Sequence, residues 1–241
     1  MKLTYIYHSG FAIEGDGFTI IIDYYKDTSD NPNEGLVHKE LLKKAGKLYV
    51  LSTHSHYDHF NKEILKWQKE RNDIIYILSK DIYDNQKAGD DAGLYMNKLE
   101  TYRDSTLSIQ AFGSTDLGGS FLIRVQGKTI FHAGDLNNWH WNEESTPEEV
   151  KEAEEFYMNE LNLLADNVNH LNLAMFPIDK RLGKDYMKGA EQFVKRIKTD
   201  IFAPMHFSEN GYESAAAFAP IAEANGTKCI CWMHRGESID F

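Results

Sequence analysis

The segment Ser52–Phe60, with the sequence STHSHYDHF, limits the possible folds of this chain more than any other segment does. It places three histidines and one aspartate within positions 54–59. The apolar run Lys47–Ser52 before it is typical of a buried strand, and Asn61 after it can cap a helix. The polar cluster is therefore predicted to lie on a strand-to-helix loop, where a rigid scaffold holds functional side chains.

The spacing within this loop favours a metal site. His54 and His56 lie two positions apart, so both imidazoles can converge on one ion in an extended segment. Asp58 and His59 follow at once, and four donors this close together indicate more than one metal ion. Imidazole combined with carboxylate suits zinc, iron or manganese. The alternative is a polar loop with solvated histidines, but the pattern H-x-H-x-D-H directly after an apolar strand argues against it.

The pattern of this loop resembles the signature of the metallo-β-lactamase superfamily of metal-dependent hydrolases. Three further segments resemble the family's strand ends in the same order along the chain, and they end at Asp23, Asp135 and His206. The opening segment YHSGF, Tyr7–Phe11, is similar to the branch that includes L-ascorbate-6-phosphate lactonase. The resemblance covers almost the whole chain, and it implies a four-layer αββα sandwich formed by residues 1–241 as one domain.

The resemblance also implies a site with two divalent metal ions, zinc in the first place and manganese or iron as alternatives. Two ions about 3.5–4 Å apart can share a hydroxide and polarise a substrate oxygen. The implied ligands are His54 and His56 for the first ion, Asp58, His59 and His206 for the second, and Asp135 as the bridge. Asp58 would also be the catalytic residue that orients the hydroxide or takes its proton, and Asp23 would organise the metal loop.

One part of the family pattern is missing here. The family usually supplies a third histidine to the first ion from the loop before a hairpin, but segment 111–116 reads AFGSTD. Asp116, His140 or another residue could take the place of that histidine. Otherwise the first site binds its ion weakly.

Other side chains are candidates for supporting roles. His132 and His8 are predicted to contact the site without binding metal, and a purely structural role is the alternative for each. The indoles of Trp139 and Trp141, on the polar segment 137–145, are predicted to form a lid over the site. Arg181 could hold a substrate carboxylate or phosphate through its two-pronged guanidinium, and a solvated charge cluster is the alternative.

The remaining chain predicts alternating strands and helices. Strands are predicted over 3–6, 11–14, 18–24, 47–52, 74–78, 107–112, 121–125, 128–132, 171–178, 201–207 and 228–233. A helix is predicted near 37–45, and another begins at Thr146, which forms a capping box with Glu149. A helix from 213 should break at Pro220.

Composition narrows the function. The formal charge is −11, from 26 basic and 37 acidic residues, which argues against a nucleic-acid partner because that would need a basic surface. No apolar run reaches the length of a membrane span, and we expect no signal peptide. The two cysteines, Cys229 and Cys231, are expected to be buried strand positions, which suits a reducing cytoplasm.

The sequence as a whole predicts a metal-dependent hydrolase that acts on an ester, lactone or phosphoester of a small anionic molecule through a metal-bound hydroxide. A non-catalytic or single-metal regulatory protein with a degraded first site is the main alternative. A flavodiiron oxidoreductase would share the fold, but that branch tends to carry a carboxylate where His56 stands. A nuclease is opposed by the acidic balance.

Overall fold

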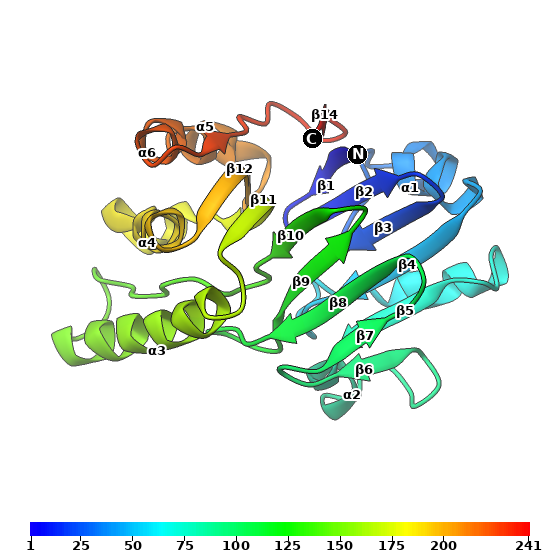
Figure 1. The fold of residues 1–241 in the computed structure, drawn as a ribbon, viewed down its shortest axis with the longest axis horizontal. Helices are drawn as coiled ribbons and strands as arrows, with labels where there is room; N and C mark the ends of the chain where they lie inside the picture. Colours follow the sequence, from blue (N-terminus) through cyan, green and yellow to red (C-terminus); the bar gives the residue numbers. More distant parts are fainter.

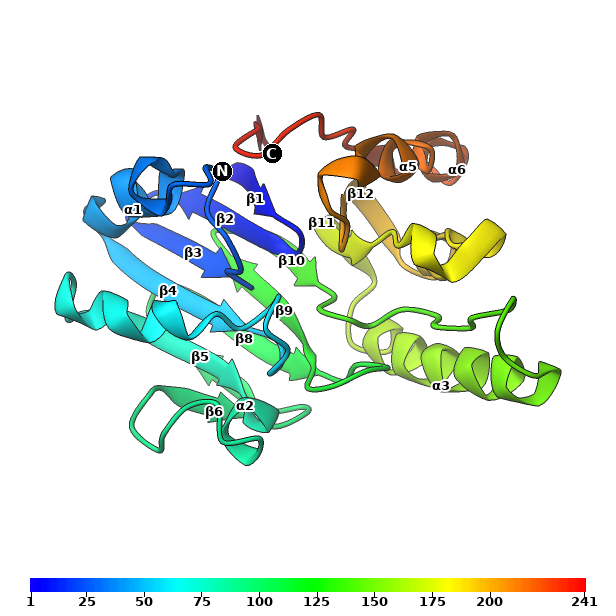
Figure 2. The same cartoon turned by 180° about the vertical axis from the view of Figure 1, so that it is seen from behind.

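Two seven-stranded mixed sheets form the centre of the molecule in the computed structural model, which describes residues 1–241 (Figure 1). The strand order is β14-β1-β2-β3-β4-β5-β6 in the first sheet and β13-β12-β11-β10-β9-β8-β7 in the second. The two chain ends lie side by side because β14 pairs with β1 (Figure 1). Helices cover the outer faces, which confirms the predicted αββα sandwich (Figure 2).

The strands of the first sheet are β1 (Lys2–Tyr7), β2 (Gly10–Gly15), β3 (Phe18–Ile22), β4 (Lys47–Ser52), β5 (Ile75–Ser79), β6 (Leu94–Met96) and β14 (Ser238–Asp240). The strands of the second sheet are β7 (Thr101–Arg103), β8 (Leu107–Phe112), β9 (Ser120–Val125), β10 (Lys128–His132), β11 (His170–Pro177), β12 (Lys198–Met205) and β13 (Lys228–Cys229).

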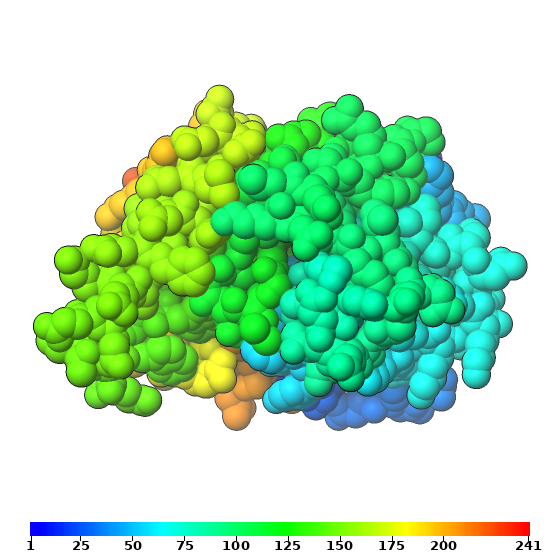
Figure 3. Space-filling model, turned by 90° about the horizontal axis from the view of Figure 1, so that it is seen from below, coloured from blue at the N-terminus to red at the C-terminus, as the bar shows by residue number.

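The α-helices are α1 (Leu36–Lys39), α2 (Lys80–Asp84), α3 (Pro147–Ala165), α4 (Lys188–Arg196), α5 (Tyr212–Ala216) and α6 (Ala219–Ala224). The 3₁₀ helices are η1 (Pro32–Glu34), η2 (Leu41–Lys43), η3 (Lys62–Lys69), η4 (Lys180–Asp185) and η5 (Glu209–Gly211). Seen from below, residues near 100–120 lie between α3 and the segment that carries β5 and α2 (Figure 3). No helix is long and apolar enough to cross a membrane.

Strand β4 shows how the layers arise from sequence. Its alternate residues point to opposite faces of the sheet. Tyr49 and Leu51 belong to the large core that fills the space between the sheets and under α3–α6. Leu48 and Val50 belong to a smaller core under α1, η2, η3 and α2. The strand is therefore apolar on both faces, which explains its unbroken run of buried residues.

Local signals set several element boundaries as predicted. The capping box of Thr146 and Glu149 is formed at the start of α3. Pro220 lies in the first turn of α6, so the predicted helix from 213 is split into α5 and α6. The helix predicted after Asn61 is present in the 3₁₀ form, with the Asn61 side chain accepting from the Glu63 N–H.

Other boundaries differ from the predictions. The strands expected over 18–24 and 201–207 end at Ile22 and Met205, because the next residue in each case has a positive φ that ends the ladder. The helix expected near 37–45 divides into α1 and η2 at Glu40, whose backbone is not helical.

The C-terminal segment also differs. The strand expected over 228–233 pairs only at Lys228 and Cys229, so Cys231 is exposed rather than buried. Strand β14, which closes the first sheet, was not predicted.

Candidate metal centre

The candidate site lies where parallel strands of both sheets end. Strands β3 and β4 are parallel neighbours, and so are β10, β11 and β12. Because parallel strands finish at the same edge of a sheet, the residues after them gather there. These residues are Asp23 after β3, the loop of residues 53–60 after β4, Asp135 after β10, Asp179 after β11 and His206 after β12.

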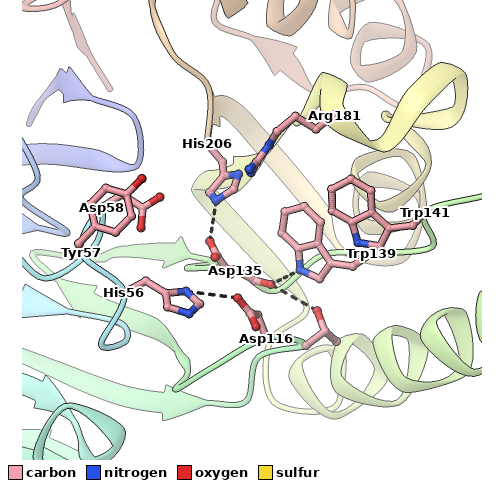
Figure 4. A pocket seen from close by; sticks show the side chains of 10 residues that line it. His56, Tyr57, Asp58, Asp116, Asp135, Trp139, Trp141, Arg181 and His206 are labelled. Carbon is pink, nitrogen blue, oxygen red and sulfur yellow. Dashed lines mark hydrogen bonds and ion pairs between the residues drawn. The ribbon is translucent and has the colours of Figure 1, made fainter. Parts of the chain in front are cut away.

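The Asp135 carboxylate lies at the centre of this cluster (Figure 4). Its Oδ1 is 3.2 Å from His59 Nε2 and 3.3 Å from His206 Nε2. Its Oδ2 is 3.4 Å from His54 Nε2. The two oxygens thus face different sets of nitrogens. This is the arrangement expected of a carboxylate that lies between two ions.

The potential ligand atoms fall into two groups. His8, Asp58, His59 and His206 form one group, and His54, His56, Asp116 and Asp135 form the other. Within each group the ligand atoms lie within 4.8 Å of one another. The structure therefore brings together the six residues that the family resemblance implied as ligands and the candidate Asp116, and it adds His8.

Two of the histidines are held from behind by buried carboxylates. His59 Nδ1 donates to Asp23 Oδ2 at 2.7 Å, and His206 Nδ1 donates to Asp179 Oδ2 at 3.0 Å. Each bond fixes the tautomer that leaves Nε2 facing Asp135. Such a carboxylate also raises the basicity of the imidazole as a ligand.

The buried charges create a field that favours cations. Burial opposes charge on His206, but Asp135 and Asp179 outweigh it and raise its pKa to about 9. Burial likewise opposes charge on His59, but Asp135 and Asp23 raise its pKa well above the usual value. Positive charge at this position is therefore stabilised, whether protons or metal ions carry it.

The other side of the cluster is open to solvent. The side chains of His56 and Asp116 are 44% and 42% exposed, and His56 Nδ1 lies 3.4 Å from Asp116 Oδ2. His54 is fully buried, but behind it stands only the Thr53 hydroxyl, 3.1 Å from Nδ1. No carboxylate fixes the ring of His54 or His56 from behind.

Asp23 and His132 occupy supporting positions behind the metal loop. Asp23 Oδ1 accepts the Thr53 N–H at 2.8 Å, so it fixes the first residue of the loop as well as His59. His132 Nε2 donates to the Ser9 carbonyl at 2.9 Å, and its Nδ1 accepts from the Gly134 N–H. Both ring nitrogens of His132 are thus engaged with backbone, away from the ligand groups.

His8 lies nearer to the ligands than a supporting residue would. Its Nε2 is 3.8 Å from Asp58 Oδ2, and its ring packs edge-on against that of His206 at 4.5 Å between centroids. Burial, together with the neighbouring positive histidines, lowers its pKa to about 2, so the imidazole is neutral.

His140 is not brought to the cluster. Its Nε2 lies 3.2 Å from the Asp185 carbonyl, and its Nδ1 accepts from the Asn142 N–H. Because backbone groups take both ring nitrogens, His140 does not replace the missing third histidine.

A cavity of about 560 Å³ opens over the cluster (Figure 4). Trp139 and Trp141 form one wall, with their rings stacked 6.3 Å apart. Trp139 Nε1 donates to the Asp135 carbonyl at 2.8 Å, which ties this wall to the metal strand. The indoles thus face the site rather than a distant surface, as the lid prediction requires.

Arg181 lines this cavity and is linked through Asp179 to His206. Its Nε donates to both oxygens of Asp179, at 3.0 and 2.9 Å, while Asp179 holds His206. Its side chain is 67% exposed, so it also reaches solvent at the mouth of the site. Arg181 therefore contacts the site, but part of its guanidinium is already engaged.

Left-handed backbone gathers around the cluster. His8, Asp23, Trp141 and His206 have φ values of 57°, 49°, 43° and 68°. Residues other than glycine pay a conformational cost in this region, and such strain collects at functional sites. Fixed turns of this kind aim the side chains inward at the ends of the strands.

Sequence reasoning missed the role of Asp179. It follows a buried parallel strand, as Asp23 and Asp135 do, and that shared position was the signal that could have revealed it. Tyr57 and Thr115, which also line the cavity, carried no comparable signal.

The cluster fits metal ions. His59 Nε2 and Asp135 Oδ1 are buried, face each other and have no hydrogen-bond partner. Unpartnered buried polar atoms are costly, and a cation held between them would satisfy both. Mixed imidazole and carboxylate donors suit zinc, iron or manganese.

Comparisons with known proteins agree with this geometry. Residues 2–150 match the β-lactamase superfamily domain. The chain is 28% identical to a UPF0173 metal-dependent hydrolase of Methanosarcina barkeri, over 100% of this chain and 98% of the relative. It is 23% identical to another from Pelotomaculum thermopropionicum, over the full length of both.

Solved structures share the fold. Igni18, a metallo hydrolase from Ignicoccus hospitalis, aligns with a TM-score of 0.69 and 21% identity over 100% of this chain and 98% of its own. CmlA, a diiron β-hydroxylase from Streptomyces venezuelae, aligns with a TM-score of 0.66 and 14% identity over 100% of this chain and 54% of its own. The full-length relatives are named metal-dependent hydrolases, and the family match over most of the chain leads to one conclusion: this chain belongs to the β-lactamase superfamily.

Proposed function

We propose that residues 1–241 act as one hydrolase domain that uses two metal ions to cleave an ester, lactone or phosphoester of a small anionic molecule. The observation that carries this proposal is the Asp135 carboxylate, whose oxygens face two separate groups of ligand atoms. The lactone option follows from the resemblance of segment 7–11 to the ascorbate-6-phosphate lactonase branch. The fold alone decides little, since it also occurs in a β-hydroxylase.

The proposed ligands divide between the two halves of the cluster. His54, His56 and Asp116 would hold the first ion, and Asp58, His59 and His206 the second, with Asp135 shared. Bound there, the ions would act as Lewis acids. They would lower the pKa of a bound water molecule towards neutrality. Zinc is the first candidate, and manganese or iron are the alternatives.

Asp58 is proposed as the residue that receives or orients the proton of the attacking water. Its side chain is 22% exposed, and it lines the large cavity beside the shared carboxylate. No partner within hydrogen-bond distance neutralises it, because its nearest basic group, His8 Nε2, is 3.8 Å away. Its oxygens therefore remain available to a water molecule in the cavity.

A second cavity reaches the same centre from another side. It has a volume of about 400 Å³ and shares Tyr57, Asp58, Arg181 and His206 with the first. Lys180 also lines it and forms no ion pair. The first cavity offers the stacked indoles instead. We therefore place the anionic end of the substrate by Lys180 and its less polar end against the indoles.

Matched esters test this proposal. The 4-nitrophenyl monoester of succinate and the 4-nitrophenyl ester of butyrate share a leaving group and differ in one terminal carboxylate. We expect the anionic ester to have the higher kcat/KM with wild type. Lys180→Gln should lower that preference several-fold, while Lys184→Gln, on the same 3₁₀ helix but outside the cavity, should not.

The outcomes separate the two parts of the proposal. Turnover of both esters without a preference for the anionic one would refute the proposed anionic substrate but not the proposed hydrolase activity. If the protein with two bound ions turns over none of these esters, no lactone and no phosphodiester, the proposed hydrolase activity is refuted.

One observation favours the alternative of a single-metal regulatory protein. His56 and Asp116 are exposed, so we expect the first site to bind its ion more weakly than the second. Metal analysis of protein purified without added metal discriminates between the two functions. One ion per chain with no turnover of any ester supports the regulatory protein, and two ions support the hydrolase.

The proposed setting is the cytoplasm. The two cysteines form no disulfide, which suits a reducing compartment.

A further inference from the structure

We propose that His8 is a ligand of the second metal ion, so that this ion is held by three imidazoles and the first by two. The inference rests on the proposed binuclear centre and goes beyond the ligand set that the family resemblance implied. It starts from the position of His8 Nε2 within the group formed with Asp58, His59 and His206.

The backbone holds His8 in a fixed and unusual position. Its φ is 57°, its N–H donates to the Tyr5 hydroxyl at 2.9 Å, and its carbonyl accepts the His206 N–H at 3.1 Å. The last bond joins the loop after β1 directly to the ligand at the end of β12. The strained turn is thus anchored on both sides, and the ring has one defined direction.

The ring presents a free nitrogen to the cluster. Nδ1 lies 3.2 Å from the Ser9 hydroxyl, which leaves Nε2 facing Asp58. The separation of 3.8 Å between Nε2 and Asp58 Oδ2 is too long for a hydrogen bond. Metal–nitrogen and metal–oxygen bonds of about 2.0–2.2 Å allow two ligand atoms of one ion to lie up to about 4.3 Å apart. The observed gap therefore suits an ion between them.

The three imidazoles surround one point. The ring centroids of His8, His59 and His206 lie 5.7, 4.5 and 5.6 Å apart in the pairs His8–His59, His8–His206 and His59–His206. The third histidine that the first site lacks is thus matched by an extra histidine at the second. This distribution makes the two ions chemically different, because two carboxylates face each ion but the second has three imidazoles and the first has two.

His8→Gly tests the role of the ring alone. Glycine tolerates the positive φ, and the backbone bond from His206 to residue 8 does not depend on the side chain. Cobalt(II) titrated into metal-free protein reports affinity by calorimetry and coordination by visible absorption. We expect the variant to lose more than about 100-fold in affinity at one site and to change its cobalt spectrum. Loss of an outer supporting group costs only about 10–100-fold.

Added imidazole and a control variant complete the test. Imidazole should enter the space left by the ring and restore the cobalt spectrum of His8→Gly. His140→Gln removes another buried imidazole near the site, one bonded only to backbone, and should leave both affinities unchanged. If wild type binds two ions and His8→Gly matches it in affinity and cobalt spectrum, His8 is not a ligand, although the binuclear centre stands. Wild type that binds no ion overturns the binuclear centre as well.

Discussion

The two halves of the ligand cluster differ in what stands behind them. We call His59 and His206 the braced half, because Asp23 and Asp179 hold their rings from behind, and both side chains are almost fully buried. We call His56 and Asp116 the open half, since both are more than 40% exposed. Ligand identity alone therefore does not set the affinity of a metal site. Ordered and desolvated ligands bind an ion with less loss of entropy than mobile exposed ones.

Asp135→Asn should have the largest effect, because Asp135 serves both halves. The amide keeps the shape but removes the charge that faces His54, His59 and His206. We expect both metal affinities to fall by more than about 100-fold, and ester turnover to be lost with them. Calorimetric titration of zinc measures this. If the variant still binds two ions as wild type does, Asp135 is not the shared ligand.

Asp179→Asn should weaken only the braced half. The amide can still contact His206 Nδ1 but no longer favours the tautomer and charge that Asp179 supports. We expect one affinity to fall by about 10–100-fold and the other to stay. The cobalt titration resolves the two steps. Arg181→Gln is the control that removes the ion pair with Asp179 but leaves the carboxylate, and an equal loss there would assign the effect to Arg181 instead.

Trp141→Ala tests whether the cavity wall acts on substrate rather than on metal. Trp141 stacks on Trp139 and belongs to neither group of ligand residues, so both metal affinities should stay unchanged. We expect the Michaelis constant for the butyrate ester to rise several-fold, because stacked aromatic contacts contribute about 0.5–1.5 kcal/mol. A weaker metal site in this variant would show that the wall shapes the metal centre instead.

Asp104→Asn should leave both metal affinities unchanged and lower only the stability of the fold. It therefore serves as a control outside the metal site. Asp104 Oδ2 accepts from Lys47 and Tyr49 at 2.7 Å each. Burial opposes its charge, but these partners hold its pKa below the usual 3.8. We expect a loss of about 1–2 kcal/mol in the free energy of unfolding at neutral pH.

The pH dependence of this loss follows from the sign of the shift. The pKa of Asp104 is lower in the folded than in the unfolded protein, so the charged carboxylate stabilises the fold at pH values above 3.8. Its contribution fades as the pH falls below that value towards the folded pKa. In urea unfolding, the difference between wild type and Asp104→Asn should therefore shrink as the pH is lowered through 3.8. A difference independent of pH contradicts this account.

The sequence predicted those parts that local patterns determine. The strand-to-helix loop at 54–59 and the capping box at Thr146 follow from short segments with strong signals. The family resemblance implied that Asp23, Asp135 and His206 lie close to that loop. The individual strands were predictable because buried parallel strands read as continuous apolar runs, and the family resemblance implied their arrangement as a sandwich.

The parts that sequence reasoning missed depend on contacts between distant segments. His8 and His206 meet only because the loop after β1 bonds to the end of β12. Asp179 gains its role only from the ring that lies beside it. Both relations join positions more than 25 residues apart, and no local pattern encodes such a pairing.

Titration of metal into metal-free wild type and into Asp116→Asn is the decisive measurement of whether one centre holds two unequal ions. We predict two binding steps in wild type, the tighter belonging to the braced half. In Asp116→Asn the tighter step should remain and the weaker one should be lost or shifted. Two equal steps in wild type, or two steps with the same affinities in wild type and Asp116→Asn, would contradict the account.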